Sequence, residues 1–238
     1  MMVKEIRLKF QESVQRTSTT KSFRFTGQER IDFIPGQFLQ FIFDEDNKNN
    51  RELNKYLSFS SSPTNDYIEV TKRLSASQFS QRLNSLKPND MVTVKAPMGT
   101  CVFDQNDKKI GFVIGGIGIT PVISIVEYII DKEVKTDIVL FYSNKSEEDI
   151  AFKKELDTWQ SISKNIKLVY TITDCQPKDD KCVFGKITNE LIANKEYDMT
   201  QRKIFIFGPP KMVNTMKNLC IEIGCKKENL RTESFIGY

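Results

Sequence analysis

The residues best suited to chemistry lie in a glycine-rich turn near the middle of the chain. Gly116 and Gly118 follow an apolar run over 109–114, and Thr120 and Pro121 open a second apolar segment. A strand, a turn without side chains and a helix N-terminus in this order bring unpaired N–H groups and partial positive charge together. We therefore expect these four residues to bind a pyrophosphate. A plain strand–turn–helix connection is the alternative, and glycines alone do not exclude it.

A second set of polar residues occupies two segments of the first half of the chain. It comprises Lys55, Tyr56, Leu57 and Ser58, then Ser77, Phe79 and Ser80. The first segment predicts a strand rich in hydroxyls that begins with a cation, although a serine-rich strand end is the simpler interpretation. Ser77 is the expected N-cap of a helix whose first N–H groups suit an anion. Two phosphate-type sites, one in each half, indicate two nucleotide cofactors that meet at a domain boundary.

Two further pairs of candidate residues lie near the C-terminus. Gly208 and Pro209 follow a predicted buried strand over 203–207, where a parallel sheet places its ligands. An ordinary start of a helix explains them equally well. Glu233 and Phe235 belong to a terminal segment whose apolar residues prefer a groove to water.

Composition excludes several classes of function. The 238 residues include 35 basic and 31 acidic side chains, and this net charge of +4 does not indicate a nucleic-acid partner. There is no histidine, which excludes histidine-ligated zinc and Ser-His-Asp catalysis within the chain. Five cysteines without a C-x-x-C pattern predict neither a metal site nor a disulfide framework. Cys220 and Cys225 flank a predicted helix end at Gly224 and are interpreted as free thiols. Any reaction must use carboxylates, hydroxyls, lysines or a bound cofactor.

The stretch from Ile110 to Val126 has the length but not the composition of a membrane span. It carries no charge, but four glycines and a proline divide it into pieces too short to cross a bilayer. A buried strand followed by a helix explains it better. The N-terminal residues lack the apolar core of a signal peptide. We therefore expect no membrane span and a cytoplasmic location.

The two halves of the chain differ in their pattern of elements. Strands are expected over 3–10, 20–26, 38–43, 56–60, 67–73 and 91–95, with one helix over 78–86. This pattern predicts a closed antiparallel Greek-key β-barrel over 1–105. Strands then alternate with helices: strands over 110–114, 137–142, 166–172, 203–207 and 230–235, and helices over 121–131, 147–160, 188–193 and 210–223. The second pattern predicts a Rossmann-like α/β domain with a parallel sheet over 106–238.

Several motifs together resemble the ferredoxin–NADP reductase-like superfamily over nearly the whole chain. They are Phe-x-Pro-Gly-Gln-Phe at 33–38, Lys-Tyr-Leu-Ser at 55–58 for Arg-x-Tyr-Ser, Ser-x-x-Ser at 77–80 for Gly-x-x-Ser, Gly-x-Gly-x-Thr-Pro at 116–121, Tyr-Ser-Asn at 142–144 with Glu-Asp-Ile at 148–150, Gly-Pro-Pro-x-Met at 208–212, and Glu-x-Phe-x-Gly-Tyr at 233–238. Each motif is modest alone. Their common order makes the resemblance specific.

The resemblance implies a barrel that binds FAD and an α/β domain that binds NAD(P)H. It further implies that hydride passes from NAD(P)H to FAD and that electrons then pass to a separate acceptor. The implied catalytic residues are Ser58 near flavin N5 and, at the nicotinamide–flavin contact, Thr120 and Glu233 together with Phe235. The implied cofactor contacts are Lys55, Tyr56, Leu57, Ser58, Ser77, Phe79, Ser80, Gly116, Gly118, Thr120, Pro121, Gly208, Pro209 and Phe235.

Three residues depart from the family pattern. Lys55 replaces an arginine that binds the flavin pyrophosphate, so the charge remains but the bidentate geometry is lost. Leu57 replaces a tyrosine that packs on the flavin. Phe207 replaces a cysteine near the nicotinamide. The first two substitutions predict weaker flavin retention, and the third puts efficient hydride transfer in question.

Neither the acceptor nor the coenzyme follows directly from a motif. A separate protein, a free flavin, a quinone or a small oxidant all fit as the acceptor. A non-turnover electron-transfer subunit or flavin-binding module of a larger complex is the alternative function. No arginine follows the second or third strand of the α/β domain, and Asp174 after the third strand is suited either to repel a 2′-phosphate or to accept a hydrogen bond from a ribose hydroxyl. NADH is therefore expected over NADPH.

Overall fold

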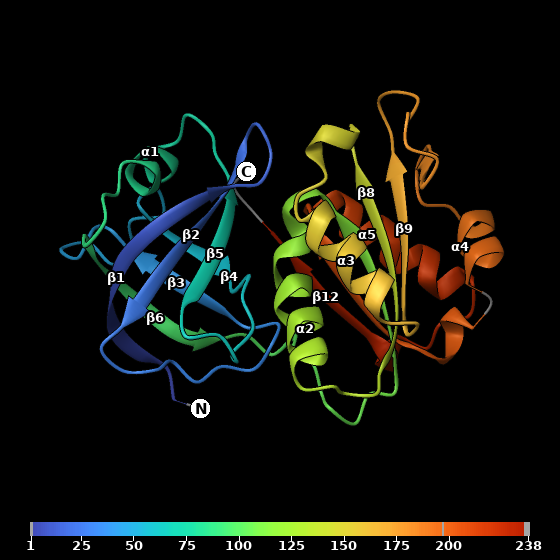
Figure 1. The fold of residues 1–238 in the computed structure, drawn as a ribbon, viewed down its shortest axis with the longest axis horizontal. Helices are drawn as coiled ribbons and strands as arrows, with labels where there is room; N and C mark the ends of the chain where they lie inside the picture. Colours follow the sequence, from blue (N-terminus) through green and yellow to red (C-terminus); the bar gives the residue numbers. More distant parts are fainter. Residues whose placement is uncertain (1, 197, 236–238) are drawn as a thin grey trace. The chain divides into compact units, whose positions relative to one another are not determined.

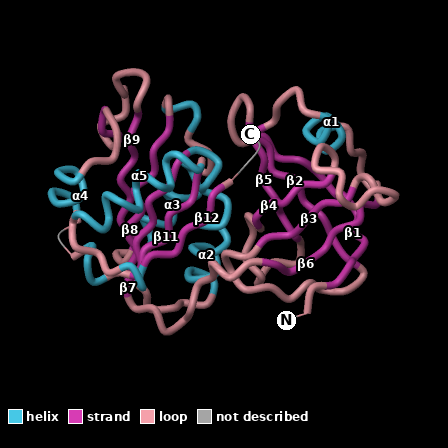
Figure 2. The backbone as a smooth tube through the Cα atoms, turned by 180° about the vertical axis from the view of Figure 1, so that it is seen from behind, coloured by secondary structure: helices cyan, strands magenta, loops and turns pink. Residues whose placement is uncertain are grey.

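The computed structural model describes residues 2–196 and 198–235, which divide into two compact units. The first unit contains 1–103 and 120–132, and the second contains 104–119 and 133–238. Each unit has its own sheet (Figures 1 and 2). Each also has its own cluster of buried apolar side chains. The expected domain boundary near residue 105 stays a prediction.

The sheet of the first unit is antiparallel, as predicted. Its strands within the described chain are β1 (Lys4–Gln15), β2 (Thr20–Gly27), β3 (Phe38–Ile42), β4 (Asn54–Ser58), β5 (Ile68–Arg73) and β6 (Met91–Met98), in the order β4-β3-β6-β1-β2-β5. A bridge between Phe59 and Val70 joins the two end strands, and the Ser60 N–H donates to the Glu69 carbonyl at 2.8 Å. These contacts close the sheet into a barrel.

Aromatic side chains fill the barrel. Phe10, Phe25 and Phe41 are nearly inaccessible to solvent, and consecutive rings in this series lie 5.4 Å apart between centroids. Such tilted pairs combine a large buried apolar area with a favourable ring geometry. Helix α1 (Gln78–Asn84) adds Phe79 to this core, and the longer α2 (Thr120–Asp131) also belongs to the first unit.

The sheet of the second unit is parallel, which confirms the predicted fold class. Its described strands are β7 (Lys109–Gly115), β8 (Asp137–Asn144), β9 (Ile166–Ile172), β10 (Cys182–Phe184), β11 (Lys203–Gly208) and β12 (Leu230–Ser234), in the order β10-β9-β8-β7-β11-β12. Helices α4 (Asn189–Lys195) and α5 (Pro210–Glu222) pack on one face. Helix α3 (Lys153–Ile162) covers the other face, where the Tyr170 hydroxyl donates to Asp157 (Figure 1).

Two elements of the second unit differ from the sequence prediction. The helix expected over 147–160 is wrong at its start, because Glu147–Asp149 forms a 3-10 turn and α3 begins at Lys153. Phe152 takes a left-handed conformation with φ 61° while its ring is 3% exposed. Burial of this ring therefore interrupts the helix. The short strand β10 was not predicted, since three residues are too few to show a period.

The uncharged stretch from Ile110 to Val126 divides as expected into β7, a 3-10 turn (η1, Gly116–Ile119) and the start of α2. In the described part of the chain, no helix combines the length and apolar character needed to cross a bilayer.

Candidate functional site

Two neighbouring lysines lie where β4 and β5 approach each other. Lys55 lies on the same face of the chain as Leu57 and Phe59, whose side chains pack against the barrel core. Lys72 lies on the same face of β5 as Val70. Lys72 is 7% exposed, and both its burial and the charge of Lys55 lower the pKa of its ammonium group. Among the described residues, no carboxylate forms an ion pair with Lys72. Two close cations for which the described residues supply no ion-pair partner suit an anion such as a cofactor pyrophosphate.

The serines that follow β4 have structural partners. The Ser60 hydroxyl donates to Glu69 Oε1 at 3.2 Å, and Ser61 Oγ accepts the Glu69 N–H at 2.9 Å. Glu69 also accepts hydrogen bonds from Arg16 and Arg24 at 3.0 Å. This buried network anchors the serine run. For these two serines the simpler interpretation as a strand end therefore holds.

Tyr56 and Ser58 lie on the face of β4 opposite Lys55. Ser58 is 7% exposed, whereas Tyr56 is 60% exposed and meets the edge of Phe38 at 5.7 Å between ring centroids. A largely exposed aromatic ring beside a half-buried one suits contact with a planar ligand. The expected roles of both residues stay predictions.

Helix α1 begins as the sequence predicted. Ser77 is its N-cap, and Ser77 Oγ accepts the Ser80 N–H at 3.3 Å. The hydroxyls of Ser77 and Ser80 are 3.1 Å apart. Phe79 is fully buried in the barrel core against Phe43, so only its backbone is placed to contact a cofactor.

The glycine turn of the second unit is defined by close backbone packing. A Cβ atom on Gly118 would lie 2.4 Å from the Phe207 carbonyl oxygen and 2.9 Å from the Gly208 nitrogen. Gly116 has a φ of +52°, in the left-handed region that glycine adopts readily. The turn therefore lies directly against the carboxyl end of β11, and the structure places Gly118 beside Gly208.

Met212 explains why a methionine follows the second proline of the Gly-Pro-Pro segment. Its sulfur occupies the space that a Cβ atom on Gly115 would need. It also lies 3.2 Å from the position that a Cβ atom on Gly208 would take. Met212 thus packs over both glycines from α5, while Pro209 is the N-cap residue of that helix and lies outside its first turn. The expected start-of-helix role of Pro209 is compatible with a ligand-binding role.

Asn144 is a candidate residue that the motif comparison quoted without a role. It ends β8 and is 5% exposed, yet among the described residues neither its Oδ1 nor its Nδ2 has a hydrogen-bond partner. An unsatisfied buried amide is costly, and it lies at the carboxyl end of a parallel strand, where ligands bind. The side chain therefore fits a polar group of a dinucleotide.

Glu233 and Phe235 lie beside β11. Glu233 pairs with Phe207 in the register of β11 and β12, and the Phe235 N–H donates to the Gly208 carbonyl at 2.9 Å. The Phe235 ring stacks on that of Phe207 with 13° between the planes. Burial raises the pKa of Glu233 to about 7, which allows the carboxyl to be protonated near neutral pH.

Helix α2 is anchored to the serine run in the first unit. Glu127 Oε2 accepts the Ser62 N–H at 2.6 Å, and its Oε1 accepts from the Asn65 amide at 3.2 Å. Asp131 accepts a hydrogen bond from the Thr64 hydroxyl. Thr120 and Pro121, at the start of this helix, are both buried. α2 therefore follows the glycine turn directly in sequence, and its side chains hydrogen-bond to the segment that follows β4.

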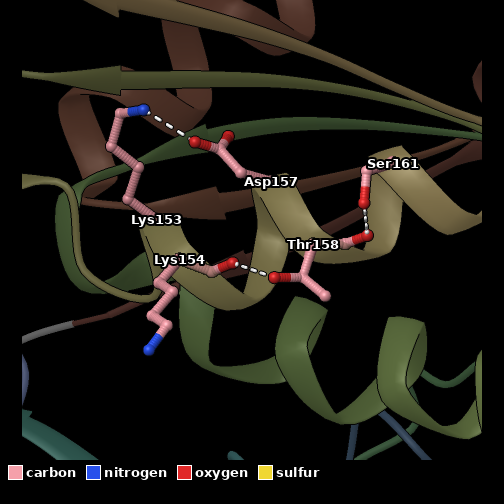
Figure 3. A pocket seen from close by; sticks show the side chains of 5 residues that line it. All are labelled: Lys153, Lys154, Asp157, Thr158 and Ser161. Atoms are coloured by element: carbon pink, nitrogen blue, oxygen red, sulfur yellow. Dashed lines mark hydrogen bonds and ion pairs between the residues drawn. The ribbon is translucent and has the colours of Figure 1, made fainter.

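A surface hollow on α3 has no relation to these residues. It is lined by Lys153, Lys154, Asp157, Thr158 and Ser161 (Figure 3). Lys153 pairs with Asp157 at 2.8 Å, and the two hydroxyls donate to carbonyls of the same helix. Because these side chains, apart from that of Lys154, bond to each other or to their own helix, the hollow offers little to a ligand.

The predicted site residues form two sets, one in each unit. The first unit holds those of β4, α1 and the start of α2, and the second holds Gly116, Gly118, Gly208, Pro209, Glu233 and Phe235. The last three residues of the terminal motif, 236–238, lie outside the described residues. Sequence reasoning missed Lys72 and gave Asn144 no role. A lysine on the same strand face as Ile68 and Val70 was the available signal for Lys72.

Comparison with known proteins assigns a domain type to each half. Residues 5–103 match the family model of the oxidoreductase FAD-binding domain, and residues 112–218 match that of the oxidoreductase NAD-binding domain. Both matches agree with the predicted cofactors, FAD and a nicotinamide dinucleotide.

Two relatives and one solved structure extend the comparison. NADH-cytochrome b5 reductase 2 of Debaryomyces hansenii is 30% identical over 217 residues, which cover 89% of this chain and 73% of that protein. An NADH-cytochrome b5 reductase-like protein of Arabidopsis thaliana is 35% identical over 139 residues, covering 57% of this chain and 42% of that protein. The cytochrome b5 reductase domain of Ulva prolifera nitrate reductase shares the fold, with a TM-score of 0.83, 20% identity and coverage of 97% of both chains.

Proposed function

Because the chain belongs to the ferredoxin–NADP reductase-like family of FAD- and NAD-binding oxidoreductases, we propose that it oxidises NADH through bound FAD and delivers the electrons to a haem protein of the cytochrome b5 class. The observation that carries this proposal is the similarity to the Debaryomyces hansenii reductase over 89% of the chain. That relative is named for NADH and for cytochrome b5.

The residues of the first unit supply an anion site and the Ser58 hydroxyl for FAD. Lys55 and Lys72 together bind the pyrophosphate, so the charge of the second lysine offsets the loss of the family arginine. The Ser77 and Ser80 end of α1 adds N–H donors, and Ser58 donates to the flavin ring. When bound, FAD supplies the redox chemistry, since it accepts a hydride and gives up electrons one at a time.

The residues of the second unit bind and orient the dinucleotide. The η1 turn offers backbone N–H groups to the pyrophosphate. The side-chain amide of Asn144 hydrogen-bonds to the adenosine half of the dinucleotide, and Asp174 accepts a hydrogen bond from a ribose hydroxyl. Glu233 and Phe235 flank the nicotinamide. The absence of an arginine after β8 and β9 favours NADH over NADPH.

Anaerobic stopped-flow reduction of the purified, FAD-loaded protein tests this function. We expect a yellow protein whose flavin absorbance is bleached by NADH at a higher bimolecular rate than by NADPH. A colourless protein that takes up no FAD on titration would contradict the assignment. A higher rate with NADPH would overturn the coenzyme preference and indicate Lys145, the lysine directly after β8, as the phosphate ligand.

Steady-state turnover then identifies the acceptor. We expect NADH-dependent reduction of a cytochrome b5 to exceed that of free FMN or a soluble quinone at equal concentration and low ionic strength. Faster reduction of one of these small acceptors would contradict a haem-protein acceptor. Rapid bleaching without turnover on any acceptor would favour the alternative role as an electron-transfer subunit of a larger complex.

A further inference from the structure

Two cysteines occupy matched positions at the end of α5. The Cys225 N–H donates to the Cys220 carbonyl at 2.9 Å, and the Gly224 N–H donates to the Ile221 carbonyl at 3.0 Å. Gly224 has a φ of +95°. These two bonds and the left-handed glycine define a Schellman motif, in which the residues at the positions of Cys220 and Cys225 usually make a hydrophobic side-chain contact.

In this motif the contact is made by two thiols. Cys220 is 0% exposed and Cys225 is 5% exposed, among apolar side chains that include Val213 and Leu230. The Cys220 thiol hydrogen-bonds to the Cys225 sulfur, and the Cys225 thiol in turn reaches the Met199 carbonyl at 3.8 Å. Within the described residues, no group of three metal-ligating side chains includes this pair. The two cysteines are therefore a buried pair of thiols joined by a hydrogen bond.

We propose that Cys220 and Cys225 are a redox site that hydrogen peroxide converts to an intramolecular disulfide across the C-terminal corner of α5. A disulfide requires α-carbons roughly 4.4–6.8 Å apart. The backbone hydrogen bond between the two residues already holds the chain in a closed turn, and the Cys220 thiol already hydrogen-bonds to Cys225. Formation of the bond needs side-chain rotation and no rearrangement of the helix.

The order of the two steps follows from the environment of each thiol. The hydrogen bond donated by Cys220 lowers the pKa of Cys225 and raises that of Cys220. Cys225 is also the more accessible sulfur. Cys225 is therefore the attacking thiolate, and Cys220 is the resolving thiol.

The chemistry balances with peroxide as the only oxidant. The Cys225 thiolate attacks one peroxide oxygen, the O–O bond breaks, and the released hydroxide takes up the thiol proton as water. The Cys220 sulfur then attacks the resulting sulfenic sulfur, and its proton leaves with the hydroxyl group as a second water. The two thiols lose two electrons, and the peroxide gains them.

The site lies next to a strand that carries a predicted nicotinamide contact. Cys225 is followed by the 3-10 turn Lys227–Asn229 and then by β12, which ends at Ser234 beside Glu233. A disulfide would fix the turn that leads into β12. The proposal itself rests on the α5 corner alone and does not depend on the proposed function.

Peptide mapping of the native FAD-loaded protein tests the proposal. The protein is treated with a small excess of hydrogen peroxide, unfolded in acid, blocked with an alkylating agent and digested with trypsin. Both cysteines fall in one expected peptide, residues 218–226. We expect this peptide to escape alkylation and to be lighter than its reduced form by two hydrogen atoms, while Cys175 and Cys182 are alkylated. Five alkylated cysteines, or a Cys225 carrying two oxygens without a cross-link, would overturn the proposal.

Matched variants and an unfolded control complete the test. Cys220→Ser and Cys225→Ser should each abolish the cross-link, whereas Cys182→Ser, at another buried thiol, should leave it unchanged. Oxidation in denaturant should lose the selectivity for this peptide, because the fold no longer holds the pair together. Equal selectivity in the unfolded chain would show that proximity in sequence, and not the helix corner, directs the reaction. That control needs no variant to fold.

Discussion

The buried position of Lys72 lowers the stability of the apoprotein. A buried ammonium group without a carboxylate partner destabilises a fold unless an anion neutralises it. The charge of the neighbouring Lys55 adds to this cost. Burial and this charge together lower the pKa of the Lys72 ammonium group. A protein that keeps such a residue without its anion loses stability, whereas the same residue with a bound pyrophosphate gains charge-assisted hydrogen bonds.

Lys72→Met should therefore have opposite effects on the apoprotein and on FAD binding. Methionine fills similar space without charge, so we expect the apoprotein to unfold at a higher urea concentration. FAD affinity should fall roughly tenfold or more, since a hydrogen bond to a charged group contributes about 1.5–3 kcal/mol. Urea unfolding and fluorescence titration with FAD measure the two effects.

The control for Lys72→Met is Lys9→Met, at an exposed strand position, which should change neither quantity. Equal losses of apoprotein stability and FAD affinity in Lys72→Met would indicate that Lys72 only packs.

Lys55→Arg should tighten FAD binding, as measured by the same fluorescence titration, because arginine restores the bidentate geometry of the family motif.

Glu233 should make stability depend on pH. Burial raises its pKa from 4.5 to about 7, so the folded state favours the protonated carboxyl. Its contribution is fully present below pH 4.5 and is lost as the pH rises through about 7. The loss is on the order of 2–3 kcal/mol. Glu233→Gln should flatten this part of the profile, as measured by urea unfolding at about pH 5 and pH 8. An unchanged difference between the two pH values would show that Glu233 ionises freely in the folded protein.

At the scale of elements, the attachment of α2 to the first unit depends on Glu127. Removal of this side chain leaves the buried Ser62 N–H without its acceptor, which costs about 1–3 kcal/mol. Glu127→Ala should lower the unfolding midpoint accordingly. Glu127→Gln keeps an acceptor oxygen for Ser62 and should lose less. If both variants lose the same stability, the carboxylate charge and not the hydrogen bond is responsible.

The glycine turn must also pack against β11. A Cβ on Gly118 would collide with the backbone of Phe207, so even Gly118→Ala should destabilise the second unit. Gly185→Ala provides the control. Its φ is +111° and nothing lies within 4 Å of a Cβ there, so it carries only the conformational cost of about 1–3 kcal/mol. We expect Gly118→Ala to lower the thermal midpoint more than Gly185→Ala. Equal shifts would show that the turn moves away from β11.

Clear periodicity made most of these elements predictable, while tertiary contacts decided the exceptions. The apolar run of β7, the glycine turn and the Ser77 cap each have a local cause and were predicted correctly. The break before α3 was not, because Phe152 leaves the helix to bury its ring. The pairing of Lys72 with Lys55 depends on the closure of the barrel. No local pattern in the sequence reports that closure.

At the scale of the molecule, the division into units cuts across the order of the chain. The glycine turn belongs to the second unit, whereas α2, which follows it directly, belongs to the first. Part of the segment matched by the NAD-binding family model therefore packs in the unit that contains the FAD-binding match. Truncation of the chain after residue 105 would separate α2 from Ser62 and Asn65, its hydrogen-bond partners.

The net charge of the whole chain bears on the proposed acceptor. With 35 basic and 31 acidic residues, the protein is expected to attract the proposed haem-protein acceptor if that acceptor is acidic and the ionic strength is low. Salt screens exposed charges beyond a Debye length of about 10 Å at 0.1 M. The bimolecular rate of reduction of an acidic cytochrome b5 should therefore fall as salt rises. Reduction of an uncharged quinone should stay constant and that of a basic cytochrome should rise, each measured under the same conditions. A rate with cytochrome b5 that is independent of salt would mean that charge does not guide this encounter, and would leave apolar contacts to determine the choice of acceptor.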